Sequence, residues 1–208
     1  MPDLDVVVHG LLRDIGVALR PLGFRGSGGV WRLIAPEGVA VVQKQGSRGS
    51  GSDAKLFYVN TAVVPRAWWD WTHGSTGPID TASESDGIRL LEGRVACTDP
   101  DHGDRDRWQV TAGTDLDRLR ADLRAGVLRA ADRLVELLEP DRYLDELRAL
   151  PNKEIGHWPP LVVLLAARGP SPELDAACSG LRDAFADQPN STKYVERLTG
   201  WAYARASR

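Results

Sequence analysis

Amide side chains at alternating positions are the first group of residues that could do chemistry. Gln43 and Gln45 are two apart at the end of an apolar run, and Tyr58 and Asn60 have the same spacing in the next one. Alternate residues of a strand face the same way, so we expect both glutamines on one face with Asn60 beside them. Amides on a covered sheet must find hydrogen-bond partners. They would either bind backbone groups or water beneath a helix, or line a ligand-binding cleft together with Tyr58.

A dense aromatic segment forms the second group, which consists of Trp68, Trp69, Trp71 and His73. Three tryptophans within four residues cannot all point into one core, so at least one should be exposed or cover a neighbouring element. Exposed tryptophan is typical of protein interfaces, where it dominates binding hot spots. The alternative is a lid over the sheet. The nearby charges are one arginine and one aspartate, and without a basic groove we expect no nucleic-acid binding.

Residue types found in catalytic and metal sites lack the spacing that their chemistry needs. The four histidines lie in separate segments, whereas a zinc site needs three or four converging ligands. Residues 99–106 are acidic, but Gly103 and Asp104 stand out of register with a calcium-binding EF-hand, which favours a solvated loop over a weak cation site. The Gly/Ser-rich residues 46–52 lack the Lys-Ser/Thr and the helix of a phosphate-binding loop. We therefore expect no catalytic residues, no metal site and no cofactor.

Composition limits the class of protein. The 208 residues are 42% hydrophobic and 26% charged, as in a soluble globular protein, and the net charge of −3 attracts neither nucleic acid nor an anionic membrane. Cys97 and Cys178 lack the spacing of a metal or redox motif, which indicates two reduced, buried thiols. The acidic N-terminus differs from a signal peptide, and residues 161–167, the longest apolar run, are far short of the ~20 residues that span a bilayer. We expect a cytoplasmic protein with no membrane contact.

Hydrophobic periodicity predicts the elements that would position these residues. Asp3 or Asp5 can cap a helix that ends at Pro21-Leu22-Gly23, where the glycine suits a left-handed cap. Period-two patterns then predict strands at residues 30–35, 39–45, 55–64, 88–97 and 107–112. The third of these strands is apolar on both faces, so we expect it to be central and covered on both sides. Residues 46–53 form the hairpin loop before it, and residues 65–86 a long connection after it.

The pattern changes to a period of 3.6 residues from Thr114, which with Asp117 can form a capping box for a long helix to Leu138. Shorter helices are predicted at residues 143–150, 161–167, 172–186 and 192–206. We therefore expect an α+β fold in which an antiparallel sheet of about five strands is flanked by the N-terminal helix and the long helix. Residues 1–150 would form this domain, with residues 151–208 as a C-terminal helical subdomain packed on it.

The order of these motifs resembles a known family. A helix, the turn Leu19-Arg20-Pro21-Leu22-Gly23-Phe24, a strand with Gln43-Lys44-Gln45 and a strand with Phe57-Tyr58-Val59-Asn60 are similar to an uncharacterised bacterial family of domains of unknown function. The similar stretch runs from about residue 4 to residue 138. The resemblance implies an α+β domain, and it brings no catalytic residue with it.

These observations favour a non-catalytic, cytoplasmic bacterial binding protein whose partner is another protein, as in an accessory or immunity-type protein that blocks its target. The alternative is a small-molecule-binding protein or an enzyme that uses a polar cleft on the sheet near Gln43, Gln45, Tyr58 and Asn60. A deep pocket lined by these amides would favour the alternative, and a flat, filled face would favour the protein partner. Ligand identity and oligomeric state have no signal in the sequence.

Overall fold

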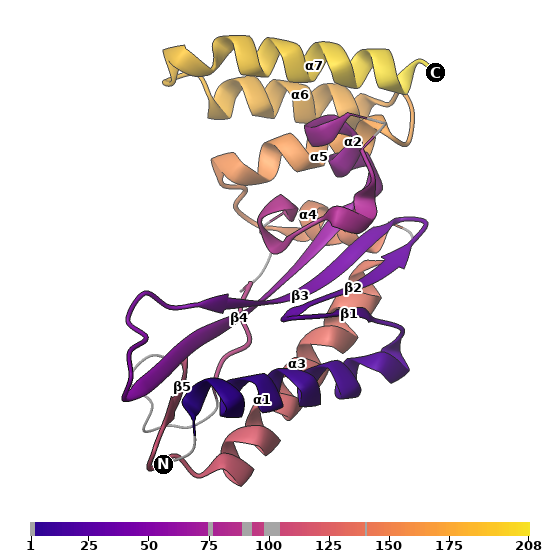
Figure 1. The fold of residues 1–208 in the computed structure, drawn as a ribbon. Coiled ribbons are helices and arrows are strands. Elements are labelled where there is room, and N and C mark those ends of the chain that lie inside the picture. Colours follow the sequence, from indigo (N-terminus) through magenta and orange to yellow (C-terminus); the bar gives the residue numbers. More distant parts are fainter. Residues whose placement is uncertain (1–2, 75–76, 89–92, 98–104, 140) are drawn as a thin grey trace.

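The computed structural model describes residues 3–74, 77–88, 93–97, 105–139 and 141–208 (Figure 1). It confirms an α+β fold built on a five-stranded antiparallel sheet, in which each strand pairs with the next one along the chain. The strands are β1 (Arg25–Ser27), β2 (Val30–Ala35), β3 (Gly38–Gly46), β4 (Ala54–Pro65) and β5 (Trp108–Thr111). β4 is long and internal, because it pairs with β3 on one side and, at its start, with β5 on the other, whereas β3 is the middle strand.

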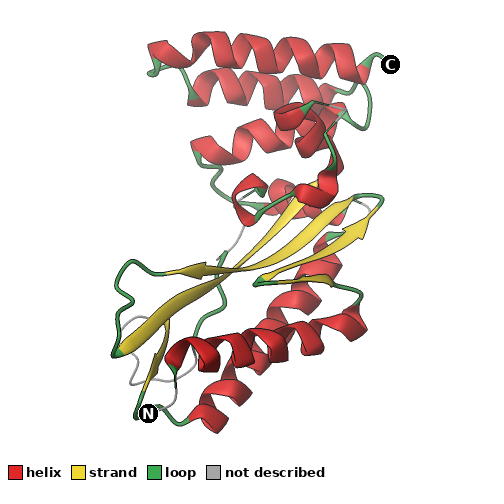
Figure 2. Cartoon of the chain, viewed as in Figure 1, coloured by secondary structure: helices red, strands yellow, loops and turns green. Residues whose placement is uncertain are grey.

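Helices cover the sheet and extend beyond it (Figure 2). The α-helices are α1 (Leu4–Leu19), α2 (Arg66–His73), α3 (Leu116–Leu137), α4 (Arg142–Ala149), α5 (Trp158–Ala166), α6 (Pro172–Ala184) and α7 (Thr192–Ala206). Short 3-10 turns are η1 (Arg20–Leu22), η2 (Ile79–Thr81), η3 (Glu84–Asp86), η4 (Ile155–His157) and η5 (Pro189–Ser191). α1 and α3 lie together under one face of the sheet, and α4 to α7 stack beyond one end of it (Figure 1).

The main core fills the space between the sheet and the α1–α3 layer. Leu11 and Ile15 of α1 and Val127 of α3 are almost fully buried there, together with Trp108 of β5. α1 comes close to the sheet because it carries Gly16: a Cβ at that position would lie 2.8 Å from Nε1 of Trp31. The glycine therefore weakens the helix intrinsically but lets a large aromatic side chain pack against it.

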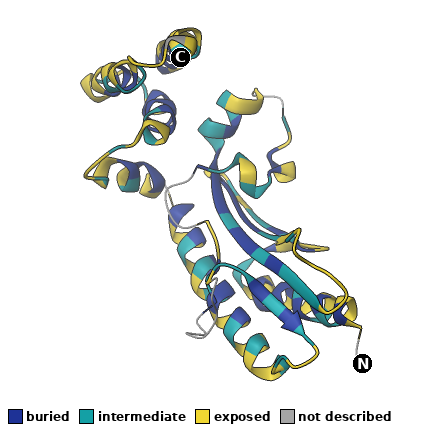
Figure 3. Cartoon of the chain, turned by 90° about the vertical axis from the view of Figure 1, so that its left-hand side faces the viewer, coloured by how far each residue is buried: buried dark blue, intermediate teal, exposed yellow. Residues whose placement is uncertain are grey.

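A smaller core occupies the opposite face, which we call the outer face of the sheet. It contains Val39, Val41, Val64, Trp69, Ile79 and Ala82. α2, η2 and η3 supply its cover, so β4 is buried on both sides over part of its length (Figure 3). Residues 65–86, predicted as a plain connection, thus contain one helix and two 3-10 turns. Their periodicity is too short to be recognised in the sequence.

Two strand predictions need correction. Residues 89–92 of the strand predicted at 88–97 lie outside the described residues, and residues 93–97 form no strand, with an isolated bridge between Arg94 and Asn60. β5 already pairs with β4 at Ala54 to Phe57, so this segment meets β4 only beyond that point, where the Val95 amide donates to the Val59 carbonyl at 2.8 Å. The fifth strand is instead β1, for which no strand is predicted from the sequence.

Helix ends follow the sequence with small differences. Asp3 caps α1 by accepting the amide N–H of Asp5 at 2.9 Å. α3 is capped by Asp115 rather than by Thr114, because the Thr114 hydroxyl accepts the amide of Thr111 instead. The two cysteines are buried and form no disulfide. None of the helices within the described ranges is long and apolar enough to cross a membrane.

Candidate functional site on the outer face of the sheet

The four polar residues predicted from β3 and β4 lie on one face, as their spacing requires. Gln43 is directly opposite Asn60 in the strand register, and Gln45 is opposite Tyr58. Gln43 Oε1 accepts the backbone amide of Glu84 at 3.3 Å, so this glutamine holds η3 against the sheet. Asn60 is 4% exposed, and its Nδ2 donates to Gln45 Oε1 at 2.8 Å. Gln43 therefore has the structural use expected from the sequence, whereas Gln45 and Asn60 bond to each other, and their contact with a ligand stays a prediction.

Gln45 and Asn60 line a hollow of about 560 Å³ on this face. Glu84, Arg94 and Asp106 also line it, so that two carboxylates and one guanidinium surround the two amides. Arg94 Nη1 lies 3.7 Å from Asp106 Oδ2. A site of this composition can hold a polar group through several hydrogen bonds, with charges of both signs to orient it.

Tyr58 is near these residues, but its ring is already in contact with a cation. The guanidinium carbon of Arg94 lies 4.3 Å from the Tyr58 ring centroid, which is within the range of a cation–π interaction. Tyr58 therefore positions Arg94 at the hollow, and a direct contact of Tyr58 with a ligand stays a prediction.

The three tryptophans of α2 diverge into different environments, as their spacing requires. Trp69 is 4% exposed in the outer-face core, and its Nε1 donates to the Gly77 carbonyl at 3.0 Å. Trp68 is half-buried and donates to the Asp86 carbonyl at 3.1 Å. Trp71 points to α7, where its ring centroid is 5.2 Å from that of Trp201. Trp68 and Trp69 thus form a lid over the outer face of the sheet, whereas Trp71 packs against α7.

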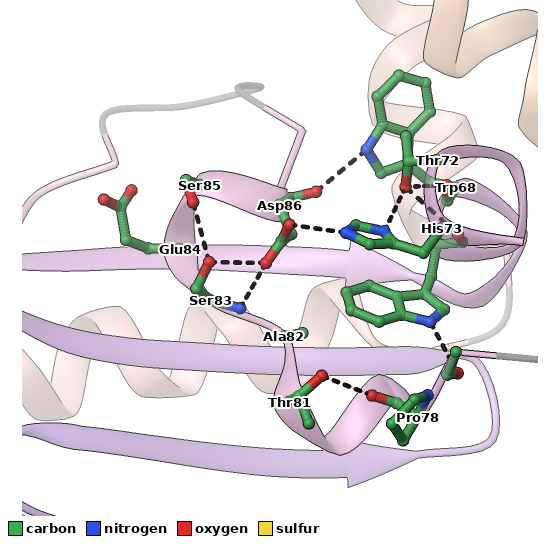
Figure 4. A network of polar contacts seen from close by, with 12 residues as sticks. Trp68, Thr72, His73, Pro78, Thr81, Ala82, Ser83, Glu84, Ser85 and Asp86 are labelled. Atoms are coloured by element: carbon green, nitrogen blue, oxygen red, sulfur yellow. Dashed lines mark hydrogen bonds and ion pairs between the residues drawn. The ribbon is translucent and has the colours of Figure 1, made fainter.

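His73 joins this lid to η3 through a polar network (Figure 4). Its ring stacks on Trp69, with centroids 3.8 Å apart and 13° between the planes. His73 Nε2 lies 3.2 Å from Asp86 Oδ1, and Asp86 Oδ2 accepts the amide of Ser83 at 2.7 Å and its hydroxyl at 2.6 Å. The residue types are those of a serine-hydrolase triad, but the carboxylate stands between the other two. Because the imidazole does not contact the serine, it cannot activate the hydroxyl.

Asp86 is the electrostatic centre of the network. Partial burial raises the pKa of its carboxyl, but the hydrogen bonds from Ser83 and the charge and hydrogen bond of His73 lower it by more. The net result is a pKa below the ordinary value, so the carboxylate is ionised and holds the network at neutral pH.

η3 brings the two sequence-predicted groups together, because Glu84 contacts Gln43 and Asp86 contacts Trp68 and His73. Glu84 and Arg94 are residues that the sequence analysis did not assign to the site, since their place depends on the path of the chain after α2. Of the acidic segment 99–106, which is predicted as a solvated loop, residues 99–104 lie outside the described residues, and Asp106 lines the hollow. No group of three metal-ligating side chains occurs in the described part of the chain.

The fold and this site define an α+β domain with a polar hollow on a partly covered antiparallel sheet. The family model for the domain of unknown function DUF4304 matches residues 15–136, from the last turns of α1 to the end of α3. Because this match spans more than half of the chain, the protein belongs to the DUF4304 family, in agreement with the resemblance seen in its motifs. No curated protein and no solved structure matches the chain.

Proposed function

We propose that this protein is a non-catalytic binding protein of the bacterial cytoplasm that holds a polar segment of a partner protein in the hollow beside Gln45 and Asn60. The observation that carries the proposal is the Asn60–Gln45 pair itself. One amide group has two donor hydrogens and two acceptor lone pairs, and this hydrogen bond uses one donor and one acceptor. The remaining capacity of two amides that line a hollow matches the donors and acceptors of a peptide backbone.

The charged residues of the hollow support a defined orientation for such a segment. Arg94 Nη1 and Asp106 Oδ2 lie 3.7 Å apart in an exposed ion pair. Such a long, solvated ion pair is weak, so both side chains can exchange it for contacts with a partner. Glu84 adds a second carboxylate, so a segment with a basic side chain is the better complement. An accessory or immunity-type role would place this hollow against the surface of the protein that is blocked.

The tryptophan-rich segment contributes less to this proposal than its sequence indicates. Trp69 is buried, and Trp68 and Trp71 are half-buried against other parts of the same chain. An interface anchor must leave its own chain to enter a pocket of the partner. We therefore assign Trp68, Trp69 and His73 to the support of the binding face, and Trp71 to the contact with α7.

A second candidate function is the binding of a small polar molecule in the same hollow. Its volume of about 560 Å³ supports this alternative, because ligand pockets commonly measure about 300–1,000 Å³. A small molecule would use the same amides and charges, so the experiment must separate the two occupants.

A photo-crosslinking amino acid placed at Glu84 would test the proposal in living cells of the native host. Glu84 lines the hollow, and a matched variant carries the same group at Ile34, which is 54% exposed near the other end of the outer face. We expect one protein to be crosslinked at Glu84 and not at Ile34. A small molecule retained by the purified protein in native mass spectrometry, without a protein crosslink, would establish the second candidate. Absence of both results would refute the assignment of this hollow as a binding site.

A further inference from the structure

A second hollow of about 210 Å³ lies where the family-matched domain meets the C-terminal helices. Its apolar wall comes from both parts of the chain: Val63 belongs to β4, Leu138 directly follows α3, Leu144 lies on α4 and Leu164 on α5. All four side chains are buried. The cavity is therefore a composite one that forms because α4 and α5 pack against the end of the sheet.

Arg66 lines this cavity at the first position of α2. It is half-buried, and within the described residues no hydrogen bond or ion pair of its guanidinium group is recorded. A guanidinium group that lines a cavity and has no partner among the described residues can pair with a ligand that supplies an anion. The geometry of guanidinium suits a carboxylate, which can accept two parallel N–H bonds.

The start of α2 also favours an anionic ligand in this cavity. Pro65, Arg66 and Ala67 all line the cavity, and no side chain among the described residues caps this end of the helix. The amide of Arg66 donates to the Glu37 carbonyl at 2.8 Å, and the first turn contains no acidic residue. The unpaired N–H groups of a helix start carry partial positive charge, so an anion beside Arg66 is stabilised by both.

The other charged residues at the cavity do not offset this preference. Asp141 already forms an ion pair with Arg168. Glu37 and Glu139 are exposed and remain hydrated, so they contribute little to the field at the apolar wall. Asp141 is also the one non-glycine residue in the described ranges with a positive φ, 65°, so the chain turns tightly at this rim.

We propose that this cavity binds a small apolar carboxylate, with its hydrocarbon part against Val63, Leu138 and Leu164 and its carboxylate at Arg66. The size is appropriate, because an apolar cavity of about 150 Å³ accepts benzene and this one measures about 210 Å³. A benzoate or a branched short-chain acid fills such a space. Since the ligand contacts residues of the sheet domain and of α4 and α5, its binding would fasten the C-terminal helices to the domain.

Benzoate and 4-methylpentanoate are the probes for the test, with three controls that each remove one feature. Benzyl alcohol keeps the ring without the charge, acetate keeps the charge without the ring, and benzylamine reverses the charge. Amide chemical shifts of the full-length protein are followed by NMR during each titration. We expect benzoate and 4-methylpentanoate to shift the Ala67 and Leu164 signals, and the controls to bind at least tenfold more weakly. Equal binding of benzyl alcohol, stronger binding of benzylamine, or no shift with either acid would overturn the proposal.

Variants of Arg66 test the role of its charge. Arg66→Gln removes the guanidinium and keeps the backbone contact with Glu37, so benzoate affinity should fall roughly 10- to 100-fold. Arg66→Lys keeps a cation and should recover part of that loss. Arg13→Gln, at an exposed position of α1, is the matched control and should leave the affinity unchanged. Unchanged affinity in Arg66→Gln would exclude Arg66 as the carboxylate partner. If that variant does not fold, the comparison of benzoate with benzyl alcohol on the wild-type protein decides.

Discussion

Asn60 donates to Gln45 across a diagonal of the sheet, 2.8 Å from Nδ2 to Oε1, although Gln43 is the residue directly opposite it. Gln43 instead accepts the amide of Glu84. Gln43 therefore holds η3 against the sheet, whereas Gln45, only two residues further along β3, lines the hollow.

Gln43→Ala should destabilise the protein because the partly buried amide of Glu84 loses its acceptor. A neutral hydrogen bond contributes about 0.5–1.5 kcal/mol, and the 3.3 Å distance places this one in the lower part of that range. For a chain of this size we expect a fall in Tm of roughly 2–4 °C per kcal/mol, measured by calorimetry. Gln109→Ala is the matched control, since no side-chain hydrogen bond of Gln109 is recorded among the described residues. An equal effect in both variants would contradict a structural role for Gln43.

Asp86→Asn should make the protein less stable at neutral pH and less sensitive to acid. The folded-state pKa of Asp86 lies below its ordinary value, so its ionisation stabilises the fold above about pH 4. That stabilisation is lost as the pH falls through the folded-state pKa. The wild-type protein should exceed the variant by about 1–3 kcal/mol at pH 7, and the difference should shrink steadily below about pH 4.

Urea unfolding at a series of pH values measures this difference. Asp80→Asn is the control, because Asp80 is an exposed carboxylate of the neighbouring turn with no side-chain partner recorded within the described residues. A difference between wild type and Asp86→Asn that stays constant from neutral to acid pH would show that the ionised carboxylate does not hold the His73–Ser83 network.

The sheet meander and the long helices could be predicted because their patterns are local. Alternating residues mark β2, β3 and β4, and apolar residues with helical spacing mark α1 and α3. The start of α5 was missed, since Pro159 and Pro160 look like a boundary although both fit the first turn of a helix. β1 was missed because three exposed residues carry no hydrophobic pattern.

The site was predictable only as far as it follows from strand alternation. The common face of Gln43, Gln45 and Asn60 depends on that alternation and on the hairpin register, both of which are local. The positions of Glu84 and Arg94 depend on how the chain returns over the sheet after α2, and no periodic signal encodes that path. For the same reason, the sequence allows the aromatic segment to be either an interface or a lid. Whether Trp71 is free or covered depends on α7, which lies more than 100 residues later in the chain.

Gly180→Ala and Gly200→Ala should have opposite effects although both lie inside neighbouring helices. A Cβ at Gly180 would overlap the indole of Trp158, whereas nothing lies within 4 Å of a Cβ at Gly200. Alanine favours a helix by about 1 kcal/mol over glycine, so Gly200→Ala should be stabilising. Overpacking costs about 1–3 kcal/mol, so Gly180→Ala should be destabilising. Calorimetry of both variants checks the signs, and Trp158→Leu combined with Gly180→Ala should recover stability. A rise in Tm for Gly180→Ala alone would show that α5 and α6 are not packed so closely.

Trp71→Ala should loosen the C-terminal helices, because Trp71 carries the aromatic contact between α2 and α7. Its ring centroid lies 5.2 Å from that of Trp201 and 6.4 Å from that of Tyr194, and the guanidinium of Arg197 lies 5.3 Å from the Trp71 ring. Truncation of a half-buried tryptophan should cost about 2–4 kcal/mol. Hydrogen exchange of the α7 amides should accelerate in Trp71→Ala and much less in Trp71→Phe, which keeps an aromatic ring. If α7 exchanges at the wild-type rate in Trp71→Ala, this tryptophan does not hold the helices and its side chain is available to a partner protein.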